Sequence, residues 1–131
     1  MRPIKVKVEV PIYDTELWII IDEEASRRRD EMRNLFGEQT LLGGWAALCS
    51  YDERTGTVAL FFYPDRMKRG MIAHEVFHAT ANILRYAGVR FEPNNHEAHA
   101  YLCGWITEQV YEAWDNETEL TKFVKAACRC L

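Results

Sequence analysis

The stretch that decides the fold comprises residues 71–106, MIAHEVFHATANILRYAGVRFEPNNHEAHAYLCGWI. It contains the pattern H-E-x-x-H at residues 74–78, inside a segment that has helical character. A helix is expected from about Asp65 to Ala87. Asp65 or a residue soon after it would be the N-cap, and Gly88 would end the helix. Pro93-Asn94-Asn95 then signals the start of a second helix.

The spacing of the two histidines in this pattern is suited to metal binding. Residues four apart on a helix lie on one face, with Cβ atoms about 5–6 Å apart, so His74 and His78 can reach one zinc ion. Glu75 projects about 100° round from His74, where a general base for zinc-bound water has to lie. A solvated helix face that happens to carry two histidines, or histidines hydrogen-bonded at an interface, is the plainer alternative.

A catalytic zinc site needs a third protein ligand, with the fourth position left for water. The candidates His96, Glu97 and His99 lie at the start of the second helix. Glu97 falls beside the apolar stripe that contains Leu102 and Ile106, whereas His99 falls within it, as a hydrogen-bonded core histidine does. The residues alone favour Glu97 and leave His96 and His99 open.

The arrangement of these motifs resembles a known class of enzymes. H-E-x-x-H followed about twenty residues later by a helix with a glutamate next to alanine is similar to the gluzincin metallopeptidases, the thermolysin-like class. Residues 97–106, EAHAYLCGWI, resemble more closely the E-A-x-A-Y-L-x-G segment of small phage-encoded proteins assigned to the metallopeptidases. The two matching stretches span about a quarter of the chain. The resemblance implies a zincin-like fold, a Zn²⁺ cofactor and Glu97 as the third ligand.

This chain departs from the thermolysin pattern at one position. That class has an aspartate four residues after its ligand glutamate, where it orients the first histidine, and this chain has Tyr101 instead. Tyr101 would hydrogen-bond near the metal or point its phenol at the oxyanion, and a packed aromatic is an equal alternative. The partner that orients His74 is therefore unassigned.

The residues before the motif predict a small sheet. Residues 5–10 alternate charged with β-branched side chains and predict a half-buried strand, while the apolar run within residues 16–22 fits either a strand or the start of a helix. Residues 22–36 predict a charged surface helix with Gly37 as its C-cap. Residues 45–51 and 57–63 predict a hairpin in which Gly56 takes a positive φ. The segment 57–63 precedes the motif helix, so we expect it to be a sheet edge that pairs with an extended peptide.

The remaining residues complete an α+β fold. The second helix is expected from His96 to about Glu117, and residues 119–127 predict a short closing helix. Residues 1–131 should therefore form a single minimal zincin-like domain. Its small, mostly antiparallel sheet would pack on the H-E-x-x-H helix and the following helix.

Composition limits the possible partners. The 131 residues are 48% hydrophobic and 27% charged, with a formal net charge of −4, which argues against a nucleic-acid-binding surface. No apolar run approaches the ~20 residues of a membrane span, and the first residues lack the features of a secretory signal. Four cysteines without a C-x-x-C pair indicate reduced thiols. We expect a cytoplasmic protein, phage-encoded in a bacterial host by its resemblance.

The sequence therefore predicts a zinc metallopeptidase that acts on a peptide or protein, with Glu75 as general base. One alternative is a zinc-stabilised protein-binding module that does not need Glu75 for catalysis. A second is a metal-free helical scaffold. The substrate and the oligomeric state stay open.

Overall fold

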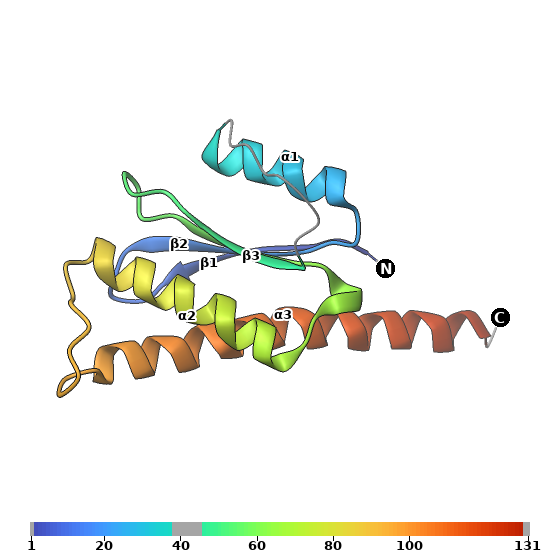
Figure 1. Cartoon of the computed structure of the whole chain (residues 1–131). Helices are drawn as coiled ribbons and strands as arrows, with labels where there is room; N and C mark the ends of the chain where they lie inside the picture. The colour runs from blue at the N-terminus through green and yellow to red at the C-terminus, as the bar shows by residue number, and fades with distance from the viewer. Residues whose placement is uncertain (1, 38–45, 130–131) are drawn as a thin grey trace.

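The computed structural model describes residues 2–37 and 46–129, without the side chains of residues 117–126, 128 and 129. A four-stranded mixed sheet lies between helix α1 on one face and helices α2 and α3 on the other (Figure 1). The predicted α+β class is therefore confirmed. In chain order the elements are β1 (Ile4–Val10), β2 (Thr15–Ile21), α1 (Ala25–Phe36), β3 (Ala47–Tyr51), β4 (Val58–Phe62), a 3-10 turn η1 (Pro64–Arg66), α2 (Arg69–Tyr86) and α3 (Glu97–Arg129).

The strand order is β1-β2-β4-β3. The β1–β2 and β3–β4 pairs are antiparallel and the β2–β4 pair is parallel, so the sheet is mostly antiparallel, as predicted. The expectation that residues 57–63 form a sheet edge is wrong, because β4 pairs on both sides and β3 is the edge next to it. All five residues of β4, VALFF, are buried, since helices cover both faces of a central strand.

The amino-terminal hairpin shows how the side-chain pattern directs each strand. In β1 the exposed residues Lys5, Lys7 and Glu9 alternate with apolar ones, which confirms the predicted period of two. The undecided run within residues 16–22 is strand β2, in which Leu17, Ile19, Ile20 and Ile21 are buried. A strand with both faces covered carries a continuous apolar run, and period-two alternation is lost there.

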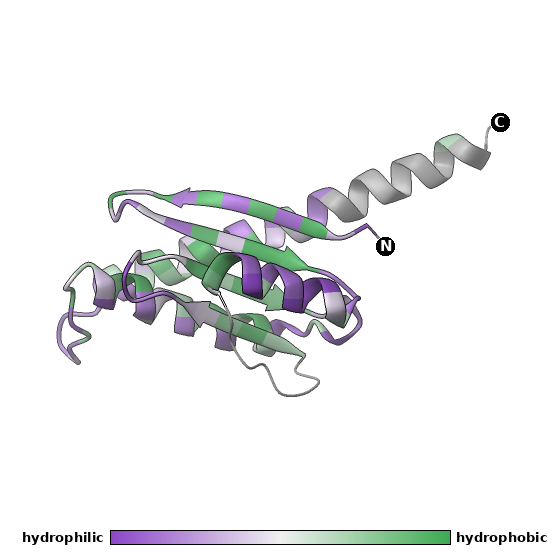
Figure 2. Ribbon diagram, turned by 90° about the horizontal axis from the view of Figure 1, so that it is seen from above, coloured by the Kyte–Doolittle hydropathy of each residue, from purple (hydrophilic) through white to green (hydrophobic). Residues whose placement is uncertain are grey.

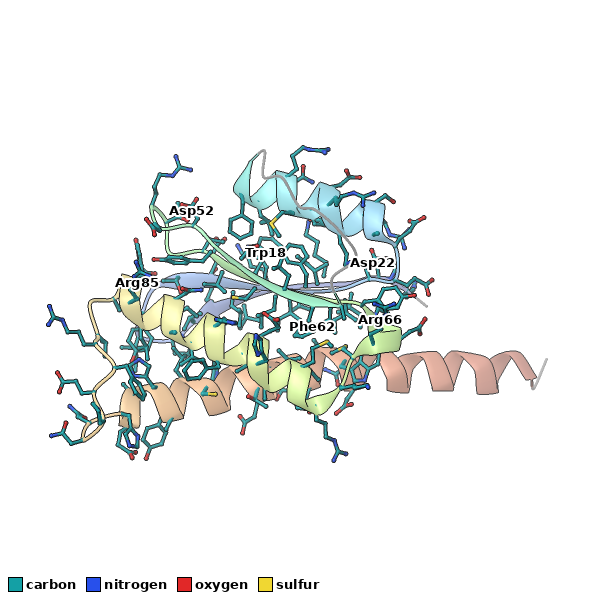
Figure 3. All side chains as sticks on the ribbon, in the orientation of Figure 1. Trp18, Asp22, Asp52, Phe62, Arg66 and Arg85 are labelled. Carbon is teal, nitrogen blue, oxygen red and sulfur yellow. The ribbon has the colours of Figure 1, made fainter. Side chains whose placement is uncertain are left out.

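The core has two parts, one on each face of the sheet. The larger part lies between the sheet and helices α2 and α3, and the smaller lies between the sheet and α1, with Ile20, Met32, Ala59 and Phe61 at its centre. Helix α1 consists mostly of hydrophilic residues, whereas hydrophobic residues dominate in several of the strands (Figure 2). Side chains fill the space around Phe62 on the α2 side (Figure 3). Leu102, Ile106 and Val110 bring α3 into the larger part.

Glycines end two elements as predicted. Gly37 has φ 77° and its N–H donates to the carbonyl of Arg33 at 2.8 Å, which closes α1. Gly56, with φ 74°, lies in the β3–β4 turn, where a Cβ atom would come within 2.5 Å of Cδ1 of Tyr86. The ring of Tyr86 at the end of α2 thus lies directly against the hairpin turn, and only glycine leaves room for it.

Helix α2 begins later and α3 ends later than predicted, whereas Gly88, with φ 79°, follows the end of α2 as predicted. Asp65 lies in η1, and α2 begins at Arg69 after Lys68, which makes no side-chain capping bond. The expected break near residue 117 is absent, because α3 is one helix of 33 residues. No glycine or proline interrupts it after Gly104, so nothing in the backbone chemistry ends it. None of the described helices has both the length and the apolar character needed to cross a bilayer.

Candidate metal centre

The two motif histidines lie side by side on α2. Both are exposed, and their Nε2 atoms are 3.2 Å apart. The ring centroids of His74 and His78 are 4.8 Å apart and the ring planes meet at 71°. The predicted convergence of the two imidazoles on one point in space is therefore present in the structure.

The distance between these nitrogen atoms matches that of two zinc ligands. Zinc binds histidine nitrogen at about 2.0–2.1 Å with tetrahedral angles, so two ligand nitrogens lie roughly 3.3–3.4 Å apart. The observed separation is close to this value. A hydrogen bond between the rings would also account for 3.2 Å, provided that one Nε2 carries a proton and the other does not. His74 and His78 thus fit a shared cation.

Glu75 is buried, unlike the two histidines beside it. Its residue is only 9% exposed, and its charge acts on Cys49 of strand β3. Burial, followed by the charge of Glu75, raises the pKa of the Cys49 thiol to about 12, and a hydrogen bond from Asn82 opposes this effect. Nδ2 of Asn82 lies 3.9 Å from Sγ of Cys49. Glu75, Cys49 and Asn82 therefore form a half-covered polar cluster between α2 and β3.

Strand β3 presents backbone groups beside this cluster that pair with no other described strand. The N–H of Asp52 donates to Thr57, and the N–H of Tyr63 donates to Ala46, both at 2.9 Å. In an antiparallel pair, hydrogen-bonded residues alternate with residues whose N–H and C=O point the other way. The register then leaves the backbone groups of Ala47, Cys49 and Tyr51 pointing to the open edge.

The predicted third ligand, Glu97, lies away from the histidine pair. It is exposed and is the first residue of α3, which packs antiparallel on α2 (Figure 1). The start of α3 is therefore beside the end of α2 near Tyr86, about eight residues or roughly 12 Å along the axis from His78. Among the described residues, no three His, Cys, Asp or Glu side chains are grouped so that they could hold one ion. Glu97 as the third ligand stays a prediction.

The alternative ligands have distinct surroundings. His96 is exposed and its ring stacks on Phe91 at a centroid distance of 6.2 Å. His99 is 8% exposed and meets the edge of Phe91 at 5.0 Å, which confirms its predicted place in the buried stripe. Its Nδ1 atom, however, has no hydrogen-bond partner among the described residues, so the expected hydrogen bond is missing. Tyr101 is 77% exposed and is not a packed aromatic.

The sequence predicts one polar neighbour of Glu75 but not the other. Asn82 follows Glu75 by seven residues, which places both on one side of α2. The contact of Cys49 with this side of α2 could not be predicted from helical spacing, because it depends on which strand forms the edge of the sheet next to α2.

Comparisons with known proteins add no relative. No family model matches the chain, and neither the curated proteins nor the solved structures contain a match. The function of this α+β domain is therefore argued from its own residues.

Proposed function

We propose that this protein is a zinc-dependent hydrolase that cleaves peptide bonds, with His74 and His78 as two of the zinc ligands. The observation that carries the proposal is the 3.2 Å separation of their Nε2 atoms on an exposed helix face. Two imidazoles held this closely have a geometry that suits one tetrahedral cation. When bound, zinc would lower the pKa of a coordinated water to about 7 and polarise the substrate carbonyl.

Glu75 is suited to the role of general base in this proposal. It follows His74 directly and is mostly shielded from solvent by β3. No described residue forms a hydrogen bond or an ion pair with its carboxylate, so its oxygen atoms are available to accept a proton. Cys49 is a poor nucleophile here, because a pKa of about 12 keeps its thiol protonated at neutral pH.

The two edges of the sheet support a peptide as substrate. Edge strand β1 carries the charged residues Lys5, Lys7 and Glu9, which protect an edge against pairing with another strand. Edge strand β3, ALCSY, carries no charge. A peptide could add to the sheet there through the outward backbone groups of Ala47, Cys49 and Tyr51, and its main chain would then run beside Glu75.

The third ligand is proposed to be Glu97, as the resemblance to gluzincins implies. The first turn of α3 would have to lie closer to His78 than it does in this structure. His96 and His99 are the competing ligands. Zinc analysis of Glu97→Gln, His96→Ala and His99→Ala decides among them, because only loss of the true ligand should release the metal at a given chelator concentration.

The proposed function is tested by measuring zinc content and peptide hydrolysis on the same preparations. His74→Ala and His78→Ala are expected to lose bound zinc and hydrolysis together. Glu75→Ala should retain zinc while turnover falls by about 10²–10⁴-fold, the usual contribution of a general base. Arg33→Gln, a substitution of an exposed residue on α1, serves as a control and should change neither quantity.

The outcomes separate the rival functions. Full zinc in the His74→Ala protein would exclude this metal site. Retained zinc together with unchanged function in Glu75→Ala would favour the zinc-stabilised binding module. Wild-type protein that is purified without chelator and contains no zinc would favour the metal-free scaffold.

A further inference from the structure

A pocket of about 660 Å³ opens at the carboxy-terminal end of α2. This volume is within the usual range for small-molecule and substrate pockets. The last turns of α2, the loop after it and the first turn of α3 form its walls. The side chains lining it include Ala81, Arg85, Val89, Arg90, Phe91 and His99.

Two arginines in this pocket have no anionic partner in the described part of the chain. Neither Arg85 nor Arg90 forms an ion pair or a hydrogen bond there, although the chain as a whole is acidic. Figure 3 shows Arg85 at the end of α2, near the β3–β4 hairpin. Guanidinium groups in planar, fixed positions bind carboxylates through two parallel hydrogen bonds. Both side chains are exposed and line one pocket, so their charges are available to an anionic ligand there.

The rest of the pocket is apolar and aromatic. Phe91 is 59% exposed, an unusual state for a phenylalanine, and it lies edge-on to His99 at 5.0 Å. His99 is 92% buried by the same measure of exposure, and its Nδ1 atom has no partner among the described residues. A ligand with an apolar body would cover Phe91 and Val89. A polar atom of that ligand, or one recruited by it, would satisfy His99.

The pocket lies on the same face of α2 as the histidine pair. His74, His78, Ala81 and Arg85 are spaced four, three and four residues apart, so they form one stripe along the helix. Seven residues of helix separate His78 from Arg85, which is roughly 10 Å. An extended peptide covers this length with about three residues.

We propose that this pocket binds a carboxylate of the substrate, with Arg85 and Arg90 holding the anion and Phe91 and Val89 covering the apolar group beside it. As a substrate subsite, the pocket rests on the proposed function. It implies a peptide with a carboxylate about three residues from the bond that is cleaved. The carboxylate is either an acidic side chain or the carboxyl terminus.

The direction in which a peptide pairs with β3 determines whether an acidic side chain or the carboxyl terminus reaches the pocket. Asn82 contacts Cys49, and the charge of Arg85 acts on Tyr51, so β3 and α2 run the same way. A peptide antiparallel to β3 would place its amino-terminal part at the pocket, and an acidic side chain would then supply the carboxylate. A peptide parallel to β3 would place its carboxyl terminus there.

The first test measures binding without hydrolysis. The probes are 3-phenylpropanoate and its neutral amide, titrated into ¹⁵N-labelled full-length protein while the arginine Nε–Hε signals are recorded. We expect saturable shifts of the Arg85 and Arg90 signals with the carboxylate, and at least about tenfold weaker binding of the amide, since a charged hydrogen bond contributes 1.5–3 kcal/mol. Equal binding of both probes, or no saturation, would overturn the proposal.

Variants make the test specific. Arg85→Gln and Arg90→Gln should each weaken carboxylate binding by about tenfold, whereas Arg33→Gln, an exposed arginine on α1, should have no effect. Unchanged backbone spectra confirm that each variant is folded. Wild-type affinity in both Arg85→Gln and Arg90→Gln would assign the shifts to another site and refute the proposal.

Competition then identifies the source of the carboxylate. One peptide is acetylated, amidated and contains a single glutamate, and a second is uncharged except for a free carboxyl terminus. Displacement of the probe by either one supports the subsite and names its source, while displacement by neither contradicts it. Loss of zinc or of hydrolysis bears only on the proposed function, because the binding of the probe needs neither.

Discussion

The two faces of the sheet differ in what their charged side chains contact. On the α1 face, Arg27 donates to the carboxylate of Asp22 at 2.7 and 2.8 Å, and the N–H of Glu24 donates to the same group at 2.8 Å (Figure 3). Arg28 donates to the backbone carbonyl of Asp22. Lys5 pairs with Glu31 at 2.6 Å. Each of these charges has a partner inside the chain.

On the α2 face the corresponding groups lack partners within the described residues. Glu75, Arg85 and Arg90 form no ion pair and no hydrogen bond there, and Nδ1 of His99 has none. Glu75 and His99 are buried, and a polar group held away from water without a partner costs folding free energy, whereas Arg85 and Arg90 are exposed to solvent. The charged groups named on the α1 face are paired with one another, whereas those named on the α2 face are the ones on which the proposed function rests.

The strongest test of this comparison is the substitution of Glu75 by glutamine. We expect turnover to fall by about 10²–10⁴-fold, because the amide cannot accept the proton. The midpoint of thermal unfolding should stay the same or rise, since a partly buried carboxylate without a partner is removed. Calorimetry and a peptide-hydrolysis assay on one preparation measure both quantities. A midpoint lowered by several degrees would show that Glu75 has a structural role.

The opposite result is expected for Asp22→Ala. This change removes a buried carboxylate that accepts two hydrogen bonds from Arg27 and one from the N–H of Glu24. The free energy of unfolding should fall by about 3 kcal/mol, as measured by urea denaturation. Zinc content and turnover should match those of the wild type. A loss of zinc in this variant would mean that the two faces are not independent.

The pH dependence of stability provides a third test. Burial of Asp22 would raise its pKa, but the hydrogen bonds from Arg27 and from the N–H of Glu24, with the charges of Arg27 and Arg28, lower it below 3.8 overall. A lowered pKa in the folded state stabilises the protein above the unfolded value, and this contribution is lost as the pH falls through the folded pKa. Urea unfolding at pH 6, 4 and 2.5 should show this loss in the wild type and a smaller one in Asp22→Asn. If the free energy of unfolding fell equally with pH in both proteins, the pKa of Asp22 would not be lowered in the folded state.

The smallest expected effect concerns the thiol of Cys49. Because burial and the charge of Glu75 raise its pKa to about 12, iodoacetamide at pH 8 should alkylate it far more slowly in the folded protein than in urea. Glu75→Gln should accelerate this reaction, since one cause of the raised pKa is removed. Mass spectrometry of digested samples follows Cys49 separately from the other cysteines. No acceleration in the variant would place Glu75 away from Cys49.

Local chemistry made several parts of the fold predictable. The alternation in β1, the terminating Gly37 and the positive φ of Gly56 each depend on a few neighbouring residues, and each is confirmed. The closeness of His74 and His78 was predictable for the same reason, because one turn of helix determines it. These features need no knowledge of distant parts of the chain.

Features that depend on distant contacts were not predictable in this way. The edge strand was assigned wrongly because chain order suggested it, although the apolar run VALFF of β4 is typical of a central strand. Helical periodicity does not show which strand covers Glu75. Which residue could be the third ligand beside His74 and His78 depends on the position of α3 along α2. The sequence does not specify how far the two helices are shifted relative to each other.

The contact between Gly56 and Tyr86 has a consequence for engineering this protein. The ring at the end of α2 lies against the β3–β4 turn, whose length sets the register between β3 and β4. Deleting one residue between Asp52 and Thr57 would move β3 by one position, and every alternate side chain would change faces. Loop grafts intended to alter selectivity should therefore keep the length of this turn and leave residue 56 as glycine.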